Sequence, residues 1–218
     1  MIRVKICGIT RPEDAELAAA LGASAVGMVF WPNSPRQVDA VRAKEIVAAL
    51  PPLVSAVGVF VNQTGDLREL AASVGLDAVQ LHGDEPPESY RELPIRTIKA
   101  IGVTGPASVA RAAAVPRRTT VLLDAHDPVR RGGTGERLDW SVAAVIARAR
   151  PVILSGGLNP GNVTLAIDTV RPAAIDVSSG VESAPGRKDP DKLRALFDVI
   201  RDSGLDSGFD SSFGIRHS

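Results

Sequence analysis

Eight short apolar runs, each followed by a segment of helical pattern, constrain the fold of this chain more than any other feature. Such alternation predicts parallel strands, because each helix returns the chain to the start of the next strand. The predicted strands are residues 3–7, 24–30, 54–61, 77–81, 95–101, 119–124, 151–155 and 174–178. The predicted helices are residues 12–21, 39–50, 66–74, 86–92, 105–114, 139–149, 160–170 and 188–203. Eight such units predict one α/β domain, a (βα)8 TIM barrel.

An open, doubly wound sheet is the alternative architecture for this alternation. Dinucleotide-binding sheets of that kind carry Gly-x-Gly-x-x-Gly after the first strand, and this chain has Cys7-Gly-Ile-Thr10 there. The barrel is expected to occupy residues 1–203. Residues 204–218 form a polar tail rich in Gly, Ser and Asp, which we expect to be poorly ordered. Packing of Phe209, Phe213 and Ile215 on the barrel is the alternative.

Charge and cysteine content exclude several classes of function. The chain has 25 basic and 25 acidic residues, so nothing indicates a nucleic-acid surface. The uncharged stretch at residues 17–32 is shorter than the ~20 residues that span a bilayer. A single cysteine fits a reducing compartment, so we expect a cytoplasmic protein. Three histidines without metal-ligand spacing argue against a metal site.

A phosphate site is predicted after the seventh and eighth strands. In Val152-Ile-Leu-Ser-Gly-Gly-Leu-Asn-Pro160, a strand is followed by Gly156 and Gly157, and Asn159 could cap a helix that begins at Pro160. Ser179 and Gly180 follow the eighth strand and could expose further amides. Each turn alone could be an ordinary tight turn. Together they occupy the usual phosphate position of an α/β barrel.

Two residues at strand ends are candidates for acid–base chemistry. Cys7 ends the first strand, and the two-residue period places Lys5 on the same side, where a cation would favour the thiolate. Asp124 ends an apolar strand, so burial should raise its pKa and allow it to donate a proton. The alternatives are an inert buried cysteine and a helix-capping or ion-paired aspartate. Asp176 could simply pair with Lys5 inside the barrel.

Other candidates surround the same predicted opening. Arg36 follows the second strand in a proline-rich loop and could bind a substrate carboxylate, although a surface arginine is the alternative. His82 follows the fourth strand as a possible donor to substrate or as a helix cap. Residues 130–135, which include Gly135, form a basic, glycine-rich loop that suits a lid over an anion, or an exposed loop without function.

Seven segments occur in order along the chain: Lys5-Ile-Cys-Gly-Ile-Thr10, Ser34-Pro-Arg36, Gln80-Leu-His-Gly83, Leu122-Leu-Asp124, Gly132-Gly-Thr-Gly135, Ser155-Gly-Gly-Leu-Asn-Pro160 and Asp176-Val-Ser-Ser-Gly-Val-Glu182. Together they resemble the phosphoribosylanthranilate isomerase family of tryptophan biosynthesis. The match covers residues 3 to about 202, and no reactive position departs from the family pattern.

The resemblance implies a (βα)8 barrel that performs an Amadori rearrangement without a cofactor. It would convert N-(5′-phosphoribosyl)anthranilate to 1-(2-carboxyphenylamino)-1-deoxyribulose 5-phosphate. Cys7 matches the general base and Asp124 the general acid, and Arg36 matches the residue that faces the anthranilate carboxylate. His82, Gly135 and Asp176 are expected substrate contacts. The expected partner is this phosphorylated small molecule, bound by a monomer or homodimer that contacts neither nucleic acid nor membrane.

Two other functions remain open from the sequence. The related histidine-pathway isomerase runs the same rearrangement on a substrate with two phosphates, but its resemblance would require a carboxylate where this chain has Cys7. A non-catalytic sugar-phosphate-binding barrel would need the phosphate turns but neither Cys7 nor Asp124. A turnover assay with both substrates separates the three readings.

Overall fold

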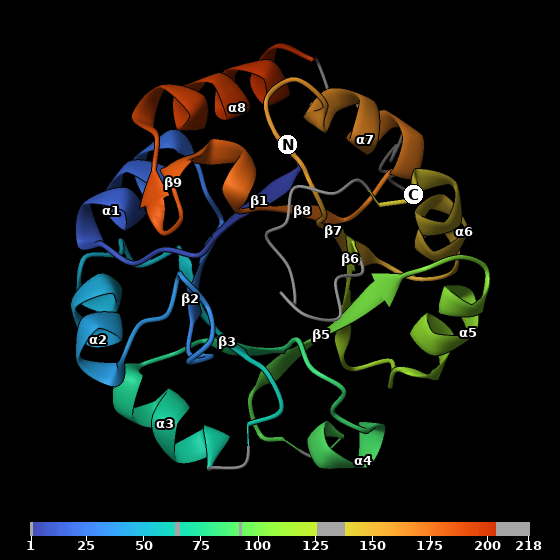
Figure 1. Cartoon of the computed structure of the whole chain (residues 1–218), viewed down its shortest axis with the longest axis horizontal. Helices are drawn as coiled ribbons and strands as arrows, with labels where there is room; N and C mark the ends of the chain where they lie inside the picture. The colour runs from blue at the N-terminus through green and yellow to red at the C-terminus, as the bar shows by residue number, and fades with distance from the viewer. Residues whose placement is uncertain (1, 64–65, 92, 126–137, 204–218) are drawn as a thin grey trace, which may run out of the picture.

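The strands close into one parallel barrel in chain order, with β8 paired to β1. The computed structural model describes residues 2–63, 66–91, 93–125 and 138–203. The barrel strands are β1 (Arg3–Cys7), β2 (Ala25–Val29), β3 (Ser55–Phe60), β4 (Ala78–Leu81), β5 (Arg96–Val103), β6 (Thr120–Ala125), β7 (Val152–Leu154) and β8 (Ala174–Val177). In Figure 1 they form an inner ring. The predicted TIM barrel is confirmed.

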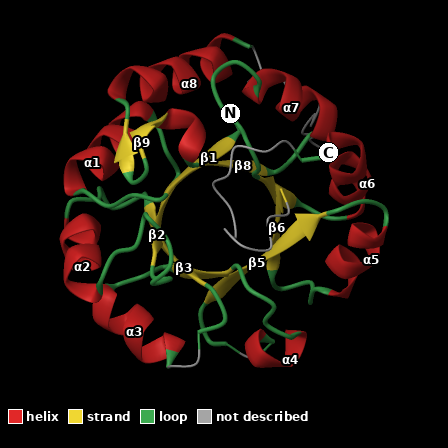
Figure 2. Cartoon of the chain, in the orientation of Figure 1, coloured by secondary structure: helices red, strands yellow, loops and turns green. Residues whose placement is uncertain are grey.

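The α-helices of the described residues form the outer ring, as Figure 2 shows in red. They are α1 (Pro12–Leu21), α2 (Ala40–Ala48), α3 (Leu67–Val74), α4 (Pro87–Tyr90), α5 (Ala107–Ala114), α6 (Trp140–Ala149), α7 (Val163–Val170) and α8 (Pro190–Asp202). Side chains of Asp39, Asp66, Asp139 and Asp189 accept hydrogen bonds from the first turns of α2, α3, α6 and α8. These caps satisfy amides that the helix itself cannot pair. None of the described helices is long and apolar enough to cross a membrane.

Two hydrophobic layers follow from strands whose side chains alternate between the barrel interior and the helices. The larger layer lies between strands and helices. The smaller one fills the barrel with Val57, Ala78, Ile98, Ala100 and Leu122. On β1 and β8 the inward positions are instead charged, since Lys5 lies in register with Asp176. Polar side chains therefore enter the barrel where β1 meets β8.

The helix predicted from residue 160 begins three residues later, at Val163. Asn159 does not cap it. The Oδ1 atom of Asn159 accepts from the amide of Gly161 at 2.9 Å, and Oδ1 of Asn162 accepts from the amide of Asn159 at 2.9 Å. Such local side-chain hydrogen bonds compete with helix formation, so residues 159–162 form a turn.

A short hairpin between β8 and α8 was not predicted. A 3-10 turn, η1 (Ser179–Val181), leads into β9 (Glu182–Ala184), which pairs antiparallel with β10 (Arg187–Lys188). Gly186 has a φ of +78°, a conformation that favours glycine, and it lies in the turn of the hairpin. The hairpin brings Glu182 and Lys188 back over the carboxyl end of the barrel, where they contact residues of β1 and of the loop after β2.

Candidate active site

A cavity of about 580 Å³ opens at the carboxyl ends of the strands and contains most of the predicted site residues. Its lining includes Cys7, Arg36, His82, Asp124, Ser155, Asp176 and Ser178. In a parallel barrel the strand ends and the loops after them meet on one face. Residues that are distant in the sequence, from β1, β4, β6 and β8, therefore share one cavity.

Cys7 lies beside a buried ion pair. The Nζ atom of Lys5 donates to Oδ1 of Asp176 at 2.8 Å, and both side chains are 5% exposed. Burial lowers the pKa of Lys5, but the carboxylate of Asp176 and the neighbouring Cys7 raise it on balance, so Lys5 is charged. The predicted pairing of Lys5 with Asp176 is thus present, and the pair is also in contact with Cys7.

Burial raises the pKa of the Cys7 thiol, and the opposing effect of Lys5 is smaller. Lys5 acts in the expected direction, since it lowers the pKa of the Cys7 thiol, but burial has the larger effect because the thiol loses more hydration than the lysine compensates. Gly27 of β2 makes room for both groups. A Cβ atom at Gly27 would lie 2.7 Å from the Cys7 sulfur and 3.0 Å from Nζ of Lys5.

Asp124 is held at the end of β6 by its own neighbour and by His82. Its Oδ1 atom accepts from the amide of Ala125 at 2.9 Å, and its Oδ2 atom lies 3.1 Å from Nε2 of His82. The carboxylate neither caps a helix nor pairs with a lysine or arginine among the described residues. Gly156 allows the turn after β7 to approach, since a Cβ there would lie 3.3 Å from Oδ1 of Asp124.

His82 is oriented by two polar side chains. Nδ1 lies 3.0 Å from Nε2 of Gln80, an amide donor, which places the imidazole proton on Nε2, facing Asp124. Gln80 is buried, and its Oε1 atom has no partner among the described residues. His82, the predicted donor to substrate, therefore faces Asp124 in this structure, and it does not cap a helix.

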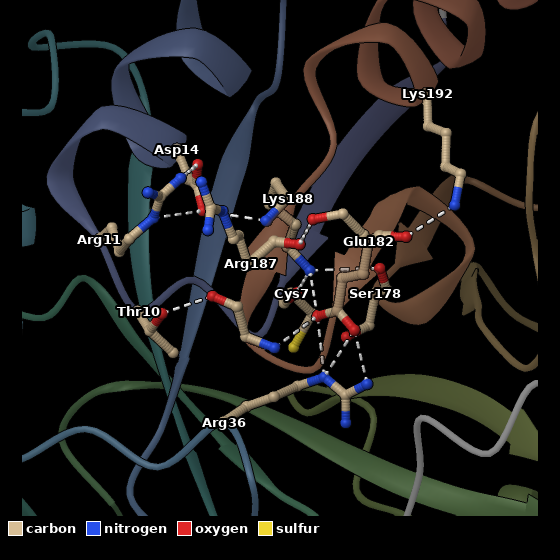
Figure 3. A network of polar contacts seen from close by, with 12 residues as sticks. Cys7, Thr10, Arg11, Asp14, Arg36, Ser178, Glu182, Arg187, Lys188 and Lys192 are labelled. Carbon is tan, nitrogen blue, oxygen red and sulfur yellow. Dashed lines mark hydrogen bonds and ion pairs between the residues drawn. The ribbon is translucent and has the colours of Figure 1, made fainter.

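Arg36 is not a surface residue, because Glu182 holds it at the cavity wall (Figure 3). Nε of Arg36 lies 2.9 Å from Oε1 of Glu182, and Nη2 lies 2.7 Å from Oε2. The two side chains are 11% and 4% exposed. The Nη1 atom has no partner among the described residues, so one edge of the guanidinium remains for a ligand.

Lys188 joins this ion pair to the strand that carries Cys7 (Figure 3). Its Nζ atom contacts Oε1 of Glu182 at 2.8 Å, the carbonyl oxygen of Cys7 at 2.6 Å and that of Ser178 at 3.2 Å. Burial lowers the pKa of Lys188. For Glu182, burial raises the pKa, but Arg36 and Lys188 lower it on balance, so Glu182 is ionised.

The sequence did not indicate this role for Glu182 and Lys188. Glu182 ends the segment that begins at Asp176, and Lys188 lies at the start of a predicted helix. Neither residue has a spacing that points to Arg36, which is 146 positions from Glu182. The only available signal was Pro185-Gly186, a pair typical of a turn, which could have predicted the hairpin.

The two predicted phosphate turns touch each other beside the cavity. A Cβ atom at Gly180 would collide with the carbonyl oxygen of Leu158 and lie 2.9 Å from Cβ of Asn159. Gly156 and Gly157 have φ angles of +86° and +69°. The amides of these three glycines make no backbone hydrogen bond within the described chain. Ser155 and Ser178, which precede the turns, line the cavity.

Gly135 and the rest of the predicted lid at residues 130–135 lie outside the described residues, as does the tail from residue 204.

The other candidate residues together define a class of protein. A (βα)8 barrel that combines a thiol, a carboxylate, a cation and paired amide-bearing turns at its carboxyl end is a barrel enzyme suited to acid–base chemistry on a phosphorylated ligand.

Comparisons with known proteins agree with this class and narrow it. Residues 4–199 match the model of the N-(5′-phosphoribosyl)anthranilate isomerase family. A relative of that name from Pseudomonas aeruginosa is 48% identical over 202 residues, which are 92% of this chain and 95% of the relative. The chain belongs to the N-(5′-phosphoribosyl)anthranilate isomerase family, and it is an isomerase.

Solved structures support the same assignment. Phosphoribosylanthranilate isomerase from Thermotoga maritima has a TM-score of 0.86 and 45% identity, covering 93% of this chain and all of its own. A phosphoribosylanthranilate isomerase solved with reduced 1-(o-carboxyphenylamino)-1-deoxyribulose 5-phosphate has a TM-score of 0.83 and 44% identity, with the same coverage.

Proposed function

We propose that this isomerase of tryptophan biosynthesis converts N-(5′-phosphoribosyl)anthranilate to 1-(2-carboxyphenylamino)-1-deoxyribulose 5-phosphate, with Cys7 as general base and Asp124 as general acid. The observation that supports the proposal most is that both side chains, from β1 and β6, line one cavity together with Arg36. The reaction is an internal transfer of hydrogen, so one acid and one base suffice.

The proposed route begins at Asp124. Its proton goes to the ribose ring oxygen, the bond between C1′ and that oxygen breaks with its electron pair going to the oxygen, and the lone pair of the nitrogen forms an iminium at C1′. The iminium acidifies the C2′ proton, which the Cys7 thiolate removes to give an enolamine. Protonation at C1′ and loss of the C2′ hydroxyl proton then give the ketone, so substrate and product have the same atoms. A positioned general acid or general base typically raises the reaction rate by about 10²–10⁴-fold.

The thiol must lose its proton before it acts as a base, because its pKa is raised in the unliganded protein. Lys5 carries its charge beside Cys7 and stabilises the thiolate once it forms. We assign Asp176 to this step as the residue that orients Lys5, with which it pairs at 2.8 Å. Its predicted contact with the substrate remains a proposal.

His82 is proposed to act at Asp124. With Nε2 at 3.1 Å from Oδ2, the imidazole donates to the carboxylate that remains after Asp124 has given up its proton. Gly135 keeps its predicted role as a substrate contact on the resemblance alone.

Arg36 and the glycine turns are proposed to hold the two ends of the substrate. The open Nη1 edge of Arg36 suits the anthranilate carboxylate, and Glu182 fixes the guanidinium in place through two further contacts. The amides of Gly156, Gly157, Ser179 and Gly180 suit the phosphate, since neighbouring backbone N–H groups bind anions. This arrangement leaves the ribose between the two catalytic groups.

Turnover of purified protein tests the proposal. Cys7→Ala and Asp124→Asn should each lower kcat by about 10²–10⁴-fold while the reduced product analogue still binds. Ser73→Ala, an exposed change on α3, is the matched control and should be fully active. An active Cys7→Ala enzyme would remove the base assignment. Turnover of the histidine-pathway substrate alone would favour that isomerase, and analogue binding without turnover in the wild type would favour a non-catalytic binder.

We further propose that the protein works in the cytoplasm as a monomer or homodimer, without nucleic acid or membrane partners. The balanced charge of the chain supports the absence of a nucleic-acid surface. A Thermotoga maritima relative, 43% identical with a TM-score of 0.83, has been solved as monomers of a dimeric enzyme. Sedimentation equilibrium of the purified chain measures the oligomeric state.

A further inference from the structure

A second cavity, of about 550 Å³, opens at the opposite end of the barrel from the active site. Its lining includes the first residue of every barrel strand: Arg3, Ala25, Ser55, Ala78, Arg96, Thr120, Val152 and Ala174. It is nearly as large as the active-site cavity, which measures about 580 Å³. Apart from Lys5, none of its lining residues takes part in the proposed isomerisation.

The lining of this second cavity is strongly cationic. It contains Arg3, Arg96, Arg117, Arg118 and Arg150 together with Lys5, and no aspartate or glutamate. The whole chain has equal numbers of basic and acidic residues, so the imbalance is local. Such a concentration of one charge costs free energy through mutual repulsion unless counter-charges are present.

Three of these cations already have partners. Lys5 pairs with Asp176. Arg96 lies 3.5 Å from Asp77. Arg150 donates to carbonyl oxygens, including those of Val115 at 2.8 Å and Thr119 at 2.7 Å, so it stabilises the loop after α5.

Arg3, Arg117 and Arg118 remain, exposed and without a carboxylate partner among the described residues. Arg117 is also close enough to Arg150 to affect it electrostatically. Burial, and secondarily the charge of Arg117, lower the pKa of Arg150. The guanidinium groups therefore converge on one space rather than spreading over the surface.

The rest of the lining provides an apolar floor and hydroxyl donors. Ile153 and Ala25 are partly buried and pack on the inner barrel cluster. Ser24, Ser55 and Thr120 line the same cavity and present hydroxyl groups to it. An apolar surface with convergent cationic and hydroxyl donors is the usual composition of a small-molecule site.

We propose that this cavity at the amino-terminal end of the barrel binds a small organic anion, a molecule with an apolar body that carries phosphate or carboxylate groups. Arg3, Arg117 and Arg118 bind the anionic groups, because a guanidinium matches the planar geometry of their oxygens. The body of the ligand packs on Ile153 and Ala25. The site is separate from the active site and can be occupied at the same time.

Two probes that share one charged group test the proposal: 1-naphthyl phosphate, which has an apolar body, and inorganic phosphate, which has none. Each is titrated into 15N-labelled protein, and amide shifts are followed by NMR. We expect 1-naphthyl phosphate to shift the amides of Ser24, Ser55 and Thr120, separately from any shifts at Gly156 and Gly157. At this second cavity it should bind at least about tenfold more tightly than inorganic phosphate, since the naphthyl group buries apolar area.

The matched variants carry the same change in net charge. Arg117→Glu/Arg118→Glu should weaken binding at the second cavity at least about tenfold and leave the shifts at Gly156 and Gly157 unchanged. Arg42→Glu/Arg68→Glu, which alters exposed arginines on α2 and α3, should leave both sets unchanged. Shifts confined to the active site, binding that survives in the first variant, or equal affinity for both probes would each overturn the proposal.

Discussion

Cys7 is a thiol that the barrel keeps protonated, and this determines how the activity should depend on pH. Its pKa is raised above the ordinary 9.0 by burial, so the thiolate fraction increases about tenfold per pH unit throughout the neutral range. We expect kcat/KM to rise from about pH 6 to about pH 9, and Cys7→Asp, whose carboxylate is ionised there, to give a much flatter profile.

Steady-state kinetics across this range measure both profiles. The natural control is Cys7→Ala, which should be slow at every pH. A wild-type profile that is flat from about pH 6 upward would contradict a thiolate base, because the fraction of base could not then limit the rate.

Glu182 is expected to support both binding and stability. Glu182→Gln keeps the shape of the side chain but leaves Arg36 and the fully buried Lys188 without their carboxylate. The free energy of unfolding should fall by about 3–5 kcal/mol, the usual effect of removing one partner of a buried ion pair. KM should rise while kcat falls less, because Arg36 loses its fixed orientation.

Urea unfolding and substrate kinetics measure the two effects. Glu45→Gln is the control, since Glu45 and Arg42 are each 51% exposed and such surface pairs contribute about 0–1 kcal/mol. If Glu182→Gln is destabilised but has an unchanged KM, Glu182 supports only the fold and not the position of Arg36.

Single side chains were predictable where their position in a strand determined their direction. Cys7, Asp124 and Asp176 lie in the cavity because strand ends in a parallel barrel converge. The protonation state of Cys7 was not predictable, since it depends on how far burial outweighs the charge of Lys5. The partner of Arg36 was not predictable either, because a contact across 146 positions leaves no spacing in one sequence.

At the scale of elements, the contact between the two glycine turns should control phosphate affinity. An alanine at Gly180 places a methyl group against the carbonyl oxygen of Leu158, so the turns after β7 and β8 must separate. Overpacking of this kind costs about 1–3 kcal/mol, and we expect the product analogue to bind about tenfold more weakly to Gly180→Ala.

Calorimetric titration of the reduced product analogue tests this expectation. Gly161→Ala is the matched control in the same loop, because a Cβ there meets only Oδ1 of Asn159 at 3.3 Å. Equal affinities in the two variants would show that the spacing of the turns does not matter to the phosphate.

Helices and strands were predictable from the sequence where a single residue pattern dominated the segment. β1 was predicted at residues 3–7 and is Arg3–Cys7, because its alternating charged and apolar residues are bounded by Gly8, which leaves no competing structure. α7 was misplaced by three residues, since the asparagines at 159 and 162 hydrogen-bond to nearby amides before the helix starts. The hairpin of β9 and β10 was missed because its strands contain only three and two residues, too few for a two-residue period to be seen.

For the whole molecule, the inner barrel core should contribute heavily to stability although it is small. Leu122 is fully buried at its centre with Val57, Ala78, Ile98 and Ala100. Leu122→Ala leaves a cavity that neighbouring strands cannot fill, so the free energy of unfolding should fall by about 2–5 kcal/mol.

Urea unfolding followed by circular dichroism measures this change. Leu53→Ala removes the same atoms from a side chain that is 95% exposed, and we expect an effect within about 0.5 kcal/mol. A Leu122→Ala protein that is as stable as this control would mean that the barrel relaxes to fill the space.

The hydrogen bond from Lys188 to the carbonyl of Cys7 spans 181 positions, and β1 gains its second neighbour only when β8 exists. A ribosome adds roughly 5–20 residues per second, so the first strand waits on the order of ten seconds or more for these contacts. Cys7 is thus synthesised early, but the contacts that fix its position form only near the end of synthesis. Chains released early by interrupted translation carry Cys7 without the lysine that anchors its strand, so catalytic competence is acquired only near the end of synthesis.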